Sequence, residues 1–351
     1  MRKFYKILII IITTVAVAEL TLRYIFPSLA YDVDFIIKPA LFAPDSVVNY
    51  MYIPNLDYTH PQTGALLHTN KHGYLGTEFP EKSDSRFRIA IVGDSWTSGD
   101  SSDEYYTTFC VELQRIFDQE GYKVDILNCG IEGDEIKYAI FKSVRYKVVG
   151  LEPDVIFFQY NLPFADNPYT RENHRDYLMY YALGDDSTRH SEMQIIDDYI
   201  EIRDIAHFIY RSNIVKVLYR VGLKYGRGKI KDYIKLTATG NLGRFERWDE
   251  LESFFSLDTS VNMVKELRDE LNDIGIRFSL YTIEKDEEAI SVAREYGLPF
   301  MNLNVLIDRK GGDIFEVGAH PTKQGNEKIA RRFSEILAKY NFIPEKFCPN
   351  N

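Results

Sequence analysis

The sequence predicts an α/β fold, a three-layer α/β/α sandwich built on a parallel sheet. Short apolar segments alternate with longer amphipathic segments between residues 86 and 345. Strands that alternate with helices in this way form right-handed crossover units, whose sheet is covered on both faces. The chain has 351 residues, 45% of them hydrophobic and 27% charged, which is enough for a full core in an ordered protein.

Each apolar segment is short and continuous, as expected for a strand buried on both faces. We expect strands at residues 87–92, 124–130, 155–161, 276–283 and 299–304. The segments between them repeat apolar residues at helical spacing, and glycines such as Gly121 and Gly275 end two of them. We expect helices at residues 105–119, 136–149, 263–274, 287–296 and 325–340.

The N-terminus carries a positively charged start followed by an apolar run. Arg2, Lys3 and Lys6 precede the run from Ile7 to Leu20, and such charges keep the N-terminus in the cytoplasm. One interpretation is a transmembrane signal anchor over residues 1–27, which makes a single-pass protein of the cell membrane. The alternative is a signal peptide cleaved near Ala18, which leaves a secreted or periplasmic protein. Both place the remaining chain on the extracytoplasmic side.

Two segments break the alternation of strands and helices. Residues 28–85 are rich in Pro, Tyr, Asn and His and predict a lead-in that packs on the main domain. Residues from about 164 to 250 are helical in tendency and form an insertion within the domain at 86–345. Inside this insertion, the stretch Arg211–Lys235 has eight basic residues and one acid. It is either an element that touches anionic lipid or glycan, or an ordinary lid helix with solvated charges.

Charge and cysteine content exclude several classes of function. A formal net charge of −10 argues against a nucleic-acid partner, which needs a positive field. The three cysteines are too few for a disulfide framework or a zinc site. A single bridge between Cys110 and Cys129 is possible in an exported protein, although spare buried thiols are the preferred interpretation. No histidine spacing indicates a metal site, and no cofactor is expected.

Two polar segments are candidates for catalysis. Ser95 directly follows the first predicted strand, at the sheet edge where open α/β folds bind ligands. A serine there can attack a carbonyl if a base lies within reach. His320 precedes Pro321 and the last predicted helix, and it is a plausible general base. The structural alternatives are a helix cap at Asp94 or Ser95 and a surface histidine beside a helix start.

Two further segments follow the second and third strands. The turn NCGIEG contains Gly133, and a glycine in such a turn lets a backbone amide approach a ligand closely. Asn161 ends the third apolar segment, where its amide bonds either to the backbone or to a developing oxyanion.

In this order, the four segments resemble the SGNH/GDSL hydrolase superfamily. The matching motifs are GDS after the first strand, N-x-G-x-x-G after the second, Asn after the third, and HP-x-x-x-G-x-x-x-I-A at the last helix. The resemblance covers roughly residues 86–163 and 260–340, and it implies an SGNH/flavodoxin-like fold. It implies Ser95 as nucleophile, His320 as base, and an oxyanion hole made by Ser95, Gly133 and Asn161. The anchored N-terminus, TNKHGYLG and GDSWTSG resemble bacterial cell-envelope members.

The chain departs from the family pattern at two places. The third block keeps only Asn161, since Gln159 and Leu162 stand where the family usually has Gly and Asp. The usual Asp two or three residues before the histidine is absent, and Glu316 and Asp313 are the nearest acids. Either acid could orient His320, or the site could run as a Ser–His dyad.

Three function classes follow from the resemblance. The first is an exported serine esterase or deacylase that acts on O-acyl esters of a small molecule or of cell-envelope carbohydrate. The second is an O-acyltransferase of surface polysaccharide that uses the same site. The third is a non-catalytic binding protein on an SGNH fold.

Overall fold

The computed structural model describes residues 2–24, 42–45, 48–59, 66–99, 108–131, 137–164, 214, 256–314 and 320–349. The chain divides into two compact units. The first comprises Met1–Ala43, Thr59–Gly64 and Gly184–Leu242, and the second comprises Pro44–Tyr58, Ala65–Leu183 and Gly243–Asn351. Apart from residues 164 and 214, the predicted insertion and its basic stretch lie outside the described residues.

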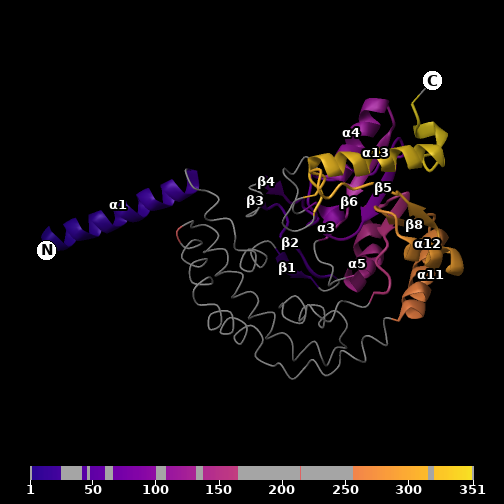
Figure 1. Ribbon diagram of the computed structural model, residues 1–351, viewed down its shortest axis with the longest axis horizontal. Helices are drawn as coiled ribbons and strands as arrows, with labels where there is room; N and C mark the ends of the chain where they lie inside the picture. The colour runs from indigo at the N-terminus through magenta and orange to yellow at the C-terminus, as the bar shows by residue number, and fades with distance from the viewer. Residues whose placement is uncertain are drawn as a thin grey trace. The chain divides into compact units, whose positions relative to one another are not determined.

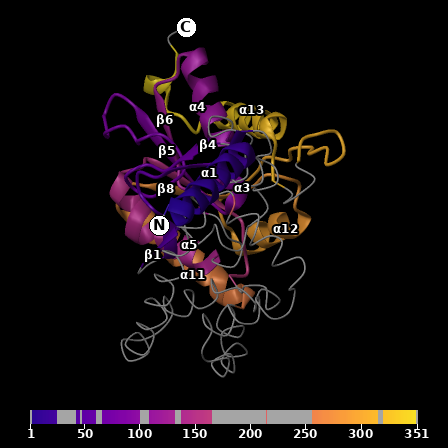
Figure 2. The ribbon, with the colours of Figure 1, turned by 90° about the vertical axis from the view of Figure 1, so that its left-hand side faces the viewer.

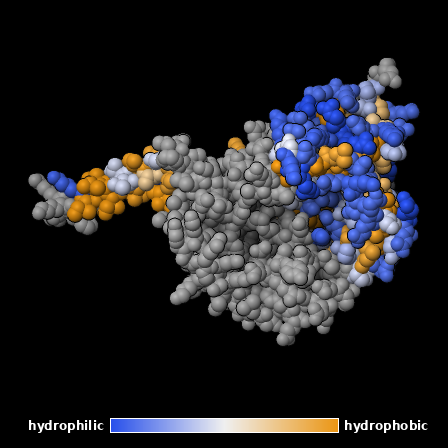
Figure 3. All heavy atoms as spheres, in the orientation of Figure 1, coloured by the Kyte–Doolittle hydropathy of each residue, from blue (hydrophilic) through white to orange (hydrophobic). Residues whose placement is uncertain are grey.

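The described part of the first unit is mainly the helix α1 (Arg2–Tyr24). Its segment Tyr5–Leu22 is the one described helix segment long and apolar enough to cross a membrane. The surface of α1 is hydrophobic over most of its length (Figure 3), and side chains such as Ile9 and Ile10 are more than half exposed. This length and composition fit both a membrane span and a signal sequence.

The second unit is built on a five-stranded sheet, which confirms the predicted three-layer α/β/α architecture (Figure 1). The strand order is β6-β5-β7-β8-β9, and every neighbouring pair is parallel. The strands are β5 (Phe87–Val92), β6 (Val124–Asn128), β7 (Val155–Gln159), β8 (Arg277–Thr282) and β9 (Phe300–Asn302). Strand order reverses between β5 and β7, and open α/β sheets bind ligands beside the carboxyl ends of strands at such a switch point.

Alternate residues of the strands bury against two different layers of helices. On one face, Phe157 of β7 packs edge-to-face on Phe333 at 5.4 Å between ring centroids. On the other face, the adjacent Phe158 packs edge-to-face on Phe141 at 6.0 Å. All six residues of β5 are buried, which explains why the strand reads as a continuous apolar run rather than an alternating one.

The helices α4 (Phe109–Glu120) and α13 (Lys323–Lys339) lie side by side over one face (Figures 1 and 2). The other face is covered by α5 (Lys137–Ser143), α11 (Leu257–Asp273) and α12 (Glu287–Tyr296). Capping residues set several of their ends. Thr108, Ser256, Asp286 and Thr322 are N-caps whose side chains accept a backbone amide of the first turn.

Element boundaries differ from the sequence prediction at several places. The helix expected from residue 105 begins at Phe109, because Thr108 has extended backbone and caps it. The helix expected over 136–149 ends at Ser143 and continues as a π-helical turn, η4 (Val144–Val148), and a 3-10 turn, η5 (Val149–Leu151). A final short 3-10 turn, η8 (Glu345–Phe347), follows α13.

The segment before the sheet contains strands that the sequence pattern did not predict. It forms two two-stranded sheets, β1 (Phe42–Asp45) with β2 (Asn49–Tyr52), and β3 (Asp57–Thr59) with β4 (Leu66–His68). These strands are three or four residues long, too short for a clear period-2 signal. Residues 80–82 are tied to the large sheet, because Lys82 pairs with Asp154 at 2.5 Å and Arg88 donates to the Pro80 carbonyl.

Candidate active site

Ser95 lies at the carboxyl edge of the sheet, at the reversal between β5 and β7. It is the first residue of α3 (Ser95–Ser98), a single helical turn that follows β5 after Gly93 and Asp94. Asp94 is the N-cap and its carboxylate accepts the Trp96 amide at 2.9 Å. Gly99 ends the turn with a φ of 78°, a left-handed conformation that favours glycine. Ser95 is 8% exposed, so most of the residue is shielded from solvent.

A cavity of about 660 Å³ opens beside this turn, and we call it the Ser95 cleft. The described residues that line it include both Ser95 and His320. The other lining residues are Asp94, Trp96, Gln159, Tyr160, Thr282, Ile283, Glu284, Lys285, Asp286, Glu287 and Arg309. The structure therefore brings to one cavity two candidates that are more than 200 residues apart in the sequence.

Four of the six charged residues described on the walls of the Ser95 cleft are paired with one another. Arg309 bonds Glu284 at 2.5 Å and lies 6.0 Å from the centre of the Trp96 ring. Lys285 pairs with Glu287. Tyr160 contributes a hydroxyl that is buried and makes no hydrogen bond within the described part of the chain. Burial, with the carboxylates of Glu288 and Asp286, raises the pKa of Tyr160 to about 12, so this hydroxyl stays a proton donor at neutral pH.

His320 stands at the end of a loop that returns to α13. An isolated antiparallel bridge joins Ile314 to Pro321, so the chain leaves at 314 and comes back at 321. The Thr322 amide donates to the Asp313 carbonyl at 2.9 Å and extends this pairing by one residue. Residues 315–319 lie outside the described residues, and Glu316 is among them.

Asp313 is fully buried at the base of this loop. Its Oδ2 accepts hydrogen bonds from Lys328 Nζ at 2.6 Å and from the Asp308 amide at 2.7 Å. Its Oδ1 is buried and accepts no hydrogen bond within the described residues. Burial acts to raise the pKa of Asp313, but the bonds from Lys328 and the Asp308 amide outweigh it, so the pKa lies below its usual value.

Two of the predicted oxyanion donors, Asn161 and Gly133, are not among the described residues that line the Ser95 cleft. Asn161 is partly exposed and is absent from the described lining of the Ser95 cleft, since β7 ends at Gln159 and the chain turns towards Pro163. Gly133 lies outside the described residues. The turn that leads to it is tightly held, because a Cβ on Gly130 would fall 2.2 Å from the Ser98 amide nitrogen. The Ile131 amide also donates to the Gly93 carbonyl at 2.9 Å.

Gln159 is a lining residue to which the sequence analysis gave no role. Its Nε2 donates to Asp94 Oδ2 at 2.8 Å, and its Oε1 accepts from the Thr97 hydroxyl at 2.8 Å. A signal was present in the sequence, because a glutamine that ends an otherwise apolar strand needs hydrogen-bond partners. The identity of those partners depends on the pairing of β7 with β5, which a local pattern does not reveal.

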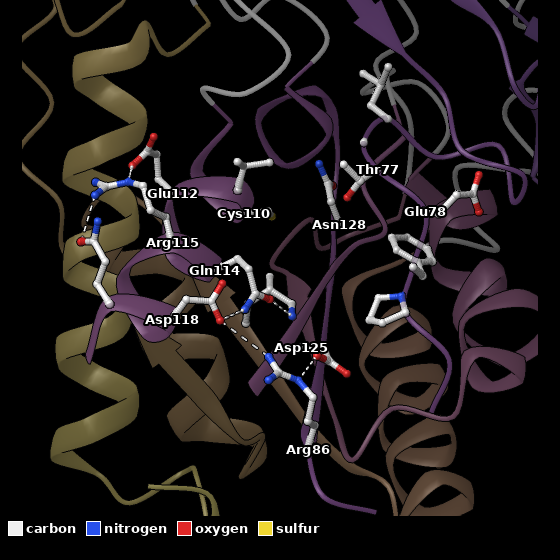
Figure 4. A pocket seen from close by; sticks show the side chains of 17 residues that line it. Thr77, Glu78, Arg86, Cys110, Glu112, Gln114, Arg115, Asp118, Asp125 and Asn128 are labelled. Atoms are coloured by element: carbon white, nitrogen blue, oxygen red, sulfur yellow. Dashed lines mark hydrogen bonds and ion pairs between the residues drawn. The ribbon is translucent and has the colours of Figure 1, made fainter. Parts of the chain in front are cut away.

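A second cavity, of about 990 Å³, lies beside the edge strand β6, and we call it the edge pocket (Figure 4). It lies between α4, β6 and residues 75–80, and its charged residues bond to one another. Arg86 bonds Asp125, and Arg115 bonds Glu112 at 2.7 Å. The Cys110 thiol lines it, but burial raises its pKa well above the usual value, so it is a poor nucleophile. No histidine is present among the described residues of its lining.

The three cysteines are unpaired, and Cys110 and Cys129 are buried. This agrees with the preferred interpretation of spare thiols rather than a bridge. Among the described residues, no group of three or more His, Cys, Asp or Glu side chains could hold a metal ion.

Several solved structures are similar to this chain. One is a protein from Desulfitobacterium hafniense assigned to the G-D-S-L lipolytic family, with 10% identity, a TM-score of 0.37, and coverage of 72% of this chain and 100% of that one. A psychrotrophic esterase from Pseudoalteromonas has 12% identity, a TM-score of 0.40, and coverage of 73% and 99%. A family 3 carbohydrate esterase from Clostridium thermocellum has 12% identity, a TM-score of 0.35, and coverage of 73% and 96%.

No family model matches the chain, and no curated protein matches it. These TM-scores are low, so the similarity by itself assigns no function to the chain.

Proposed function

We propose that the chain is an exported serine hydrolase that cleaves O-acyl esters, with Ser95 as nucleophile and His320 as general base. One observation carries this proposal: a serine at the carboxyl edge of a parallel sheet and a histidine from the last loop line the same cavity. Ligands bind at this edge in open α/β folds, and a Ser–His pair is the minimum for acyl transfer through a serine.

The reaction proceeds in two halves. His320 takes the proton of the Ser95 hydroxyl as its oxygen attacks the ester carbonyl carbon, and a tetrahedral oxyanion forms. The intermediate collapses, His320 returns the proton to the leaving alcohol, and the acyl group stays on Ser95. Water then attacks the acyl-enzyme with His320 again as base, which releases the carboxylic acid and restores Ser95.

The oxyanion needs hydrogen-bond donors aimed at the place where charge develops. We retain the backbone amides of Ser95 and Gly133 and the side chain of Asn161 as the proposed donors, on the family resemblance.

Asp313 is the acid that we propose to orient His320. The antiparallel bridge between Ile314 and Pro321 makes residues 313 and 320 diagonal neighbours on one face of the pairing. Such neighbours are separated by about 7–8 Å, within reach of a carboxylate and an imidazole. A lowered pKa keeps Asp313 ionised, and its buried Oδ1 accepts no hydrogen bond within the described residues. Glu316 and a Ser–His dyad are the alternatives, and the Asp313→Asn variant distinguishes Asp313 from both.

The lining of the cleft favours a polar substrate with a short acyl group. Its walls carry six charged side chains around Ser95, namely Asp94, Glu284, Lys285, Asp286, Glu287 and Arg309. Burying a long apolar chain against them would desolvate these groups without replacing their hydrogen bonds. Trp96 and Tyr160 contribute aromatic rings to the lining. We therefore propose an acylated carbohydrate of the cell envelope, with α1 as a membrane anchor that leaves the second unit outside the cytoplasm.

The test is hydrolysis of p-nitrophenyl acetate and of acetylated xylan by the purified full-length protein in detergent. Ser95→Ala is expected to reduce turnover to background, whereas Ser85→Ala, a matched change at an exposed serine before β5, keeps it. Unchanged turnover in Ser95→Ala would refute the assignment.

Hydrolysis and transfer share every step up to the acyl-enzyme. They are separated by following acetate in the presence of an oligosaccharide acceptor. A hydrolase releases free acetate, and an O-acyltransferase leaves the acetate on the acceptor.

A further inference from the structure

The turn that carries Ser95 is held from outside by one side chain. The Gln159 amide lies across it, with Nε2 donating to Asp94 Oδ2 at 2.8 Å and Oε1 accepting from Thr97 Oγ1 at 2.8 Å. The Asp94 backbone amide also donates to Gln159 Oε1, at 3.3 Å. Gln159 therefore bonds to the residue before Ser95 and to the residue two positions after it.

This connection matters because α3 has only four residues. A single helical turn fixes several backbone dihedrals for very few hydrogen bonds, so it is unstable unless other parts of the fold support it. Asp94 supplies part of that support as N-cap, with one carboxylate oxygen on the Trp96 amide. Gln159 binds the other oxygen and so fixes the orientation of the cap.

The hydrogen bonds run in one direction through the core. Thr97 has one hydroxyl proton, which goes to Gln159 Oε1, so the Tyr281 hydroxyl must donate to Thr97 Oγ1 at 2.7 Å. The chain of donors thus runs from Tyr281 through Thr97 and Gln159 to the Asp94 carboxylate. Thr97 and Tyr281 are fully buried, and buried chains of this kind strengthen one another.

The backbone at Gly93 lies in close contact with the side chains of Thr97 and Gln159. A Cβ at this position would lie 2.2 Å from Thr97 Oγ1 and 2.3 Å from Gln159 Oε1. The glycine of the GDS segment therefore leaves the space in which the glutamine amide meets the turn. The network joins three neighbouring strands, β5, β7 and β8, at the edge where Ser95 stands.

We propose that Gln159 is a positioning residue for the nucleophile: its amide joins Asp94 to Thr97 and so holds Ser95 in its reactive placement. This inference rests on the proposed function, in which Ser95 attacks the ester. Gln159 acts through Asp94 and Thr97.

The first test measures the rate at which a fluorophosphonate probe labels Ser95, because that step reports the nucleophile and needs no natural substrate. Gln159→Met keeps the length of the side chain and removes its hydrogen bonds. We expect labelling to slow by about tenfold to a hundredfold, the cost of a nucleophile displaced by a fraction of an ångström. Gln119→Met, a matched change on the surface of α4, is expected to label at the wild-type rate.

The second test uses pH to distinguish whether Gln159 acts through its hydrogen bonds to the Ser95 turn or only packs against that turn. Gln159→Glu places a second carboxylate against Asp94, so the two repel when both are ionised and bond when they share a proton. The labelling rate of Gln159→Glu relative to wild type is expected to rise as pH falls from 9 to 6. Taking this ratio removes the effect of pH on His320, which is common to both proteins.

The third test uses Thr97, should Gln159→Met fail to fold. Thr97→Ser keeps the hydroxyl and is expected to label at nearly the wild-type rate. Thr97→Val removes it, leaves Gln159 and Tyr281 without their shared partner, and is expected to label about tenfold more slowly.

Two results overturn the inference while leaving the proposed function intact. The first is labelling of Gln159→Met or Thr97→Val at the wild-type rate while Ser95→Ala is not labelled. The second is a Gln159→Glu ratio that does not change with pH. Labelling of Ser95→Ala at the wild-type rate overturns the proposed function, and this inference with it.

Discussion

The Ser95 cleft and the edge pocket differ in where they lie relative to the sheet and in which polar side chains line them. The edge pocket is the larger, at about 990 Å³ against 660 Å³. Its polar side chains complete the structure: Gln114 donates to the Val124 carbonyl and accepts from the Ile126 amide, and so caps the exposed edge of β6. The Ser95 cleft lies at the carboxyl end of the strands and is lined by Ser95 and His320. Position relative to the sheet, rather than size, indicates where chemistry can occur.

The largest expected difference between the two cavities is in catalysis. His320→Gln removes the base from the cleft and should lower kcat/KM for p-nitrophenyl acetate by about a thousandfold or more. Cys110→Ala, which removes the one thiol of the edge pocket, should leave kcat/KM unchanged. Steady-state kinetics of both variants check this, and a loss of activity in Cys110→Ala would mean that the edge pocket takes part in the reaction.

Asp313 tests whether the loop base contributes to chemistry. Asp313→Asn should lower kcat by about a hundredfold or more if the carboxylate orients His320. Lys328→Gln is the matched control, because it removes the Lys328 ion pair with Asp313 and leaves the carboxylate in place. Equal losses in the two variants would show that Asp313 acts only by holding the loop, and an unchanged kcat in Asp313→Asn would favour a dyad or Glu316.

A substitution in the edge pocket should lower the stability of the protein and leave its activity unchanged. Arg86 bonds Asp125, whose side chain is only 6% exposed. Arg86→Gln should therefore lower the free energy of unfolding by about 1–2 kcal/mol, because a largely buried carboxylate loses the nearer of its two cationic partners and keeps only Arg88, at 3.9 Å. Urea denaturation measures the loss, and kcat/KM should not change. A fall in kcat/KM in a folded Arg86→Gln protein would mean that the edge pocket also contributes to catalysis.

The smallest expected effect is on acid stability. The pKa of Asp313 is lower in the folded protein than in the unfolded chain, so its contribution is present above the unfolded value of about 3.9 and is lost as pH falls through the folded value. The difference in unfolding free energy between wild type and Asp313→Asn should narrow between pH 6 and pH 3. A difference that does not change over this range would contradict the lowered pKa.

The sequence predicted the strands of the large sheet well because each strand can be recognised from its own residues alone. A fully buried strand such as Phe87–Val92 is a continuous apolar run whatever its neighbours are, and all five strands lie where such runs occur. Ser95 and His320 were predicted in the same way, since each stands beside a strand or helix end. The short strands β1–β4 carry too few residues for a periodic signal and were not predicted.

Features that depend on packing between distant segments were not predicted. The role of Gln159 requires that β7 lie next to β5, so that its amide meets Asp94 and Thr97. The burial of Asp313 and its bond to Lys328 likewise depend on how the loop folds back on α13. A local pattern contains neither fact.

The measurement that tests the central claim most directly is mass-spectrometric mapping of the intact protein after reaction with a fluorophosphonate probe. We predict one adduct per chain, located on the peptide that contains Ser95, and no adduct in Ser95→Ala or in wild type denatured before the probe is added. An adduct on any other peptide, or no reaction of the folded wild-type protein, would contradict a serine nucleophile at the end of β5.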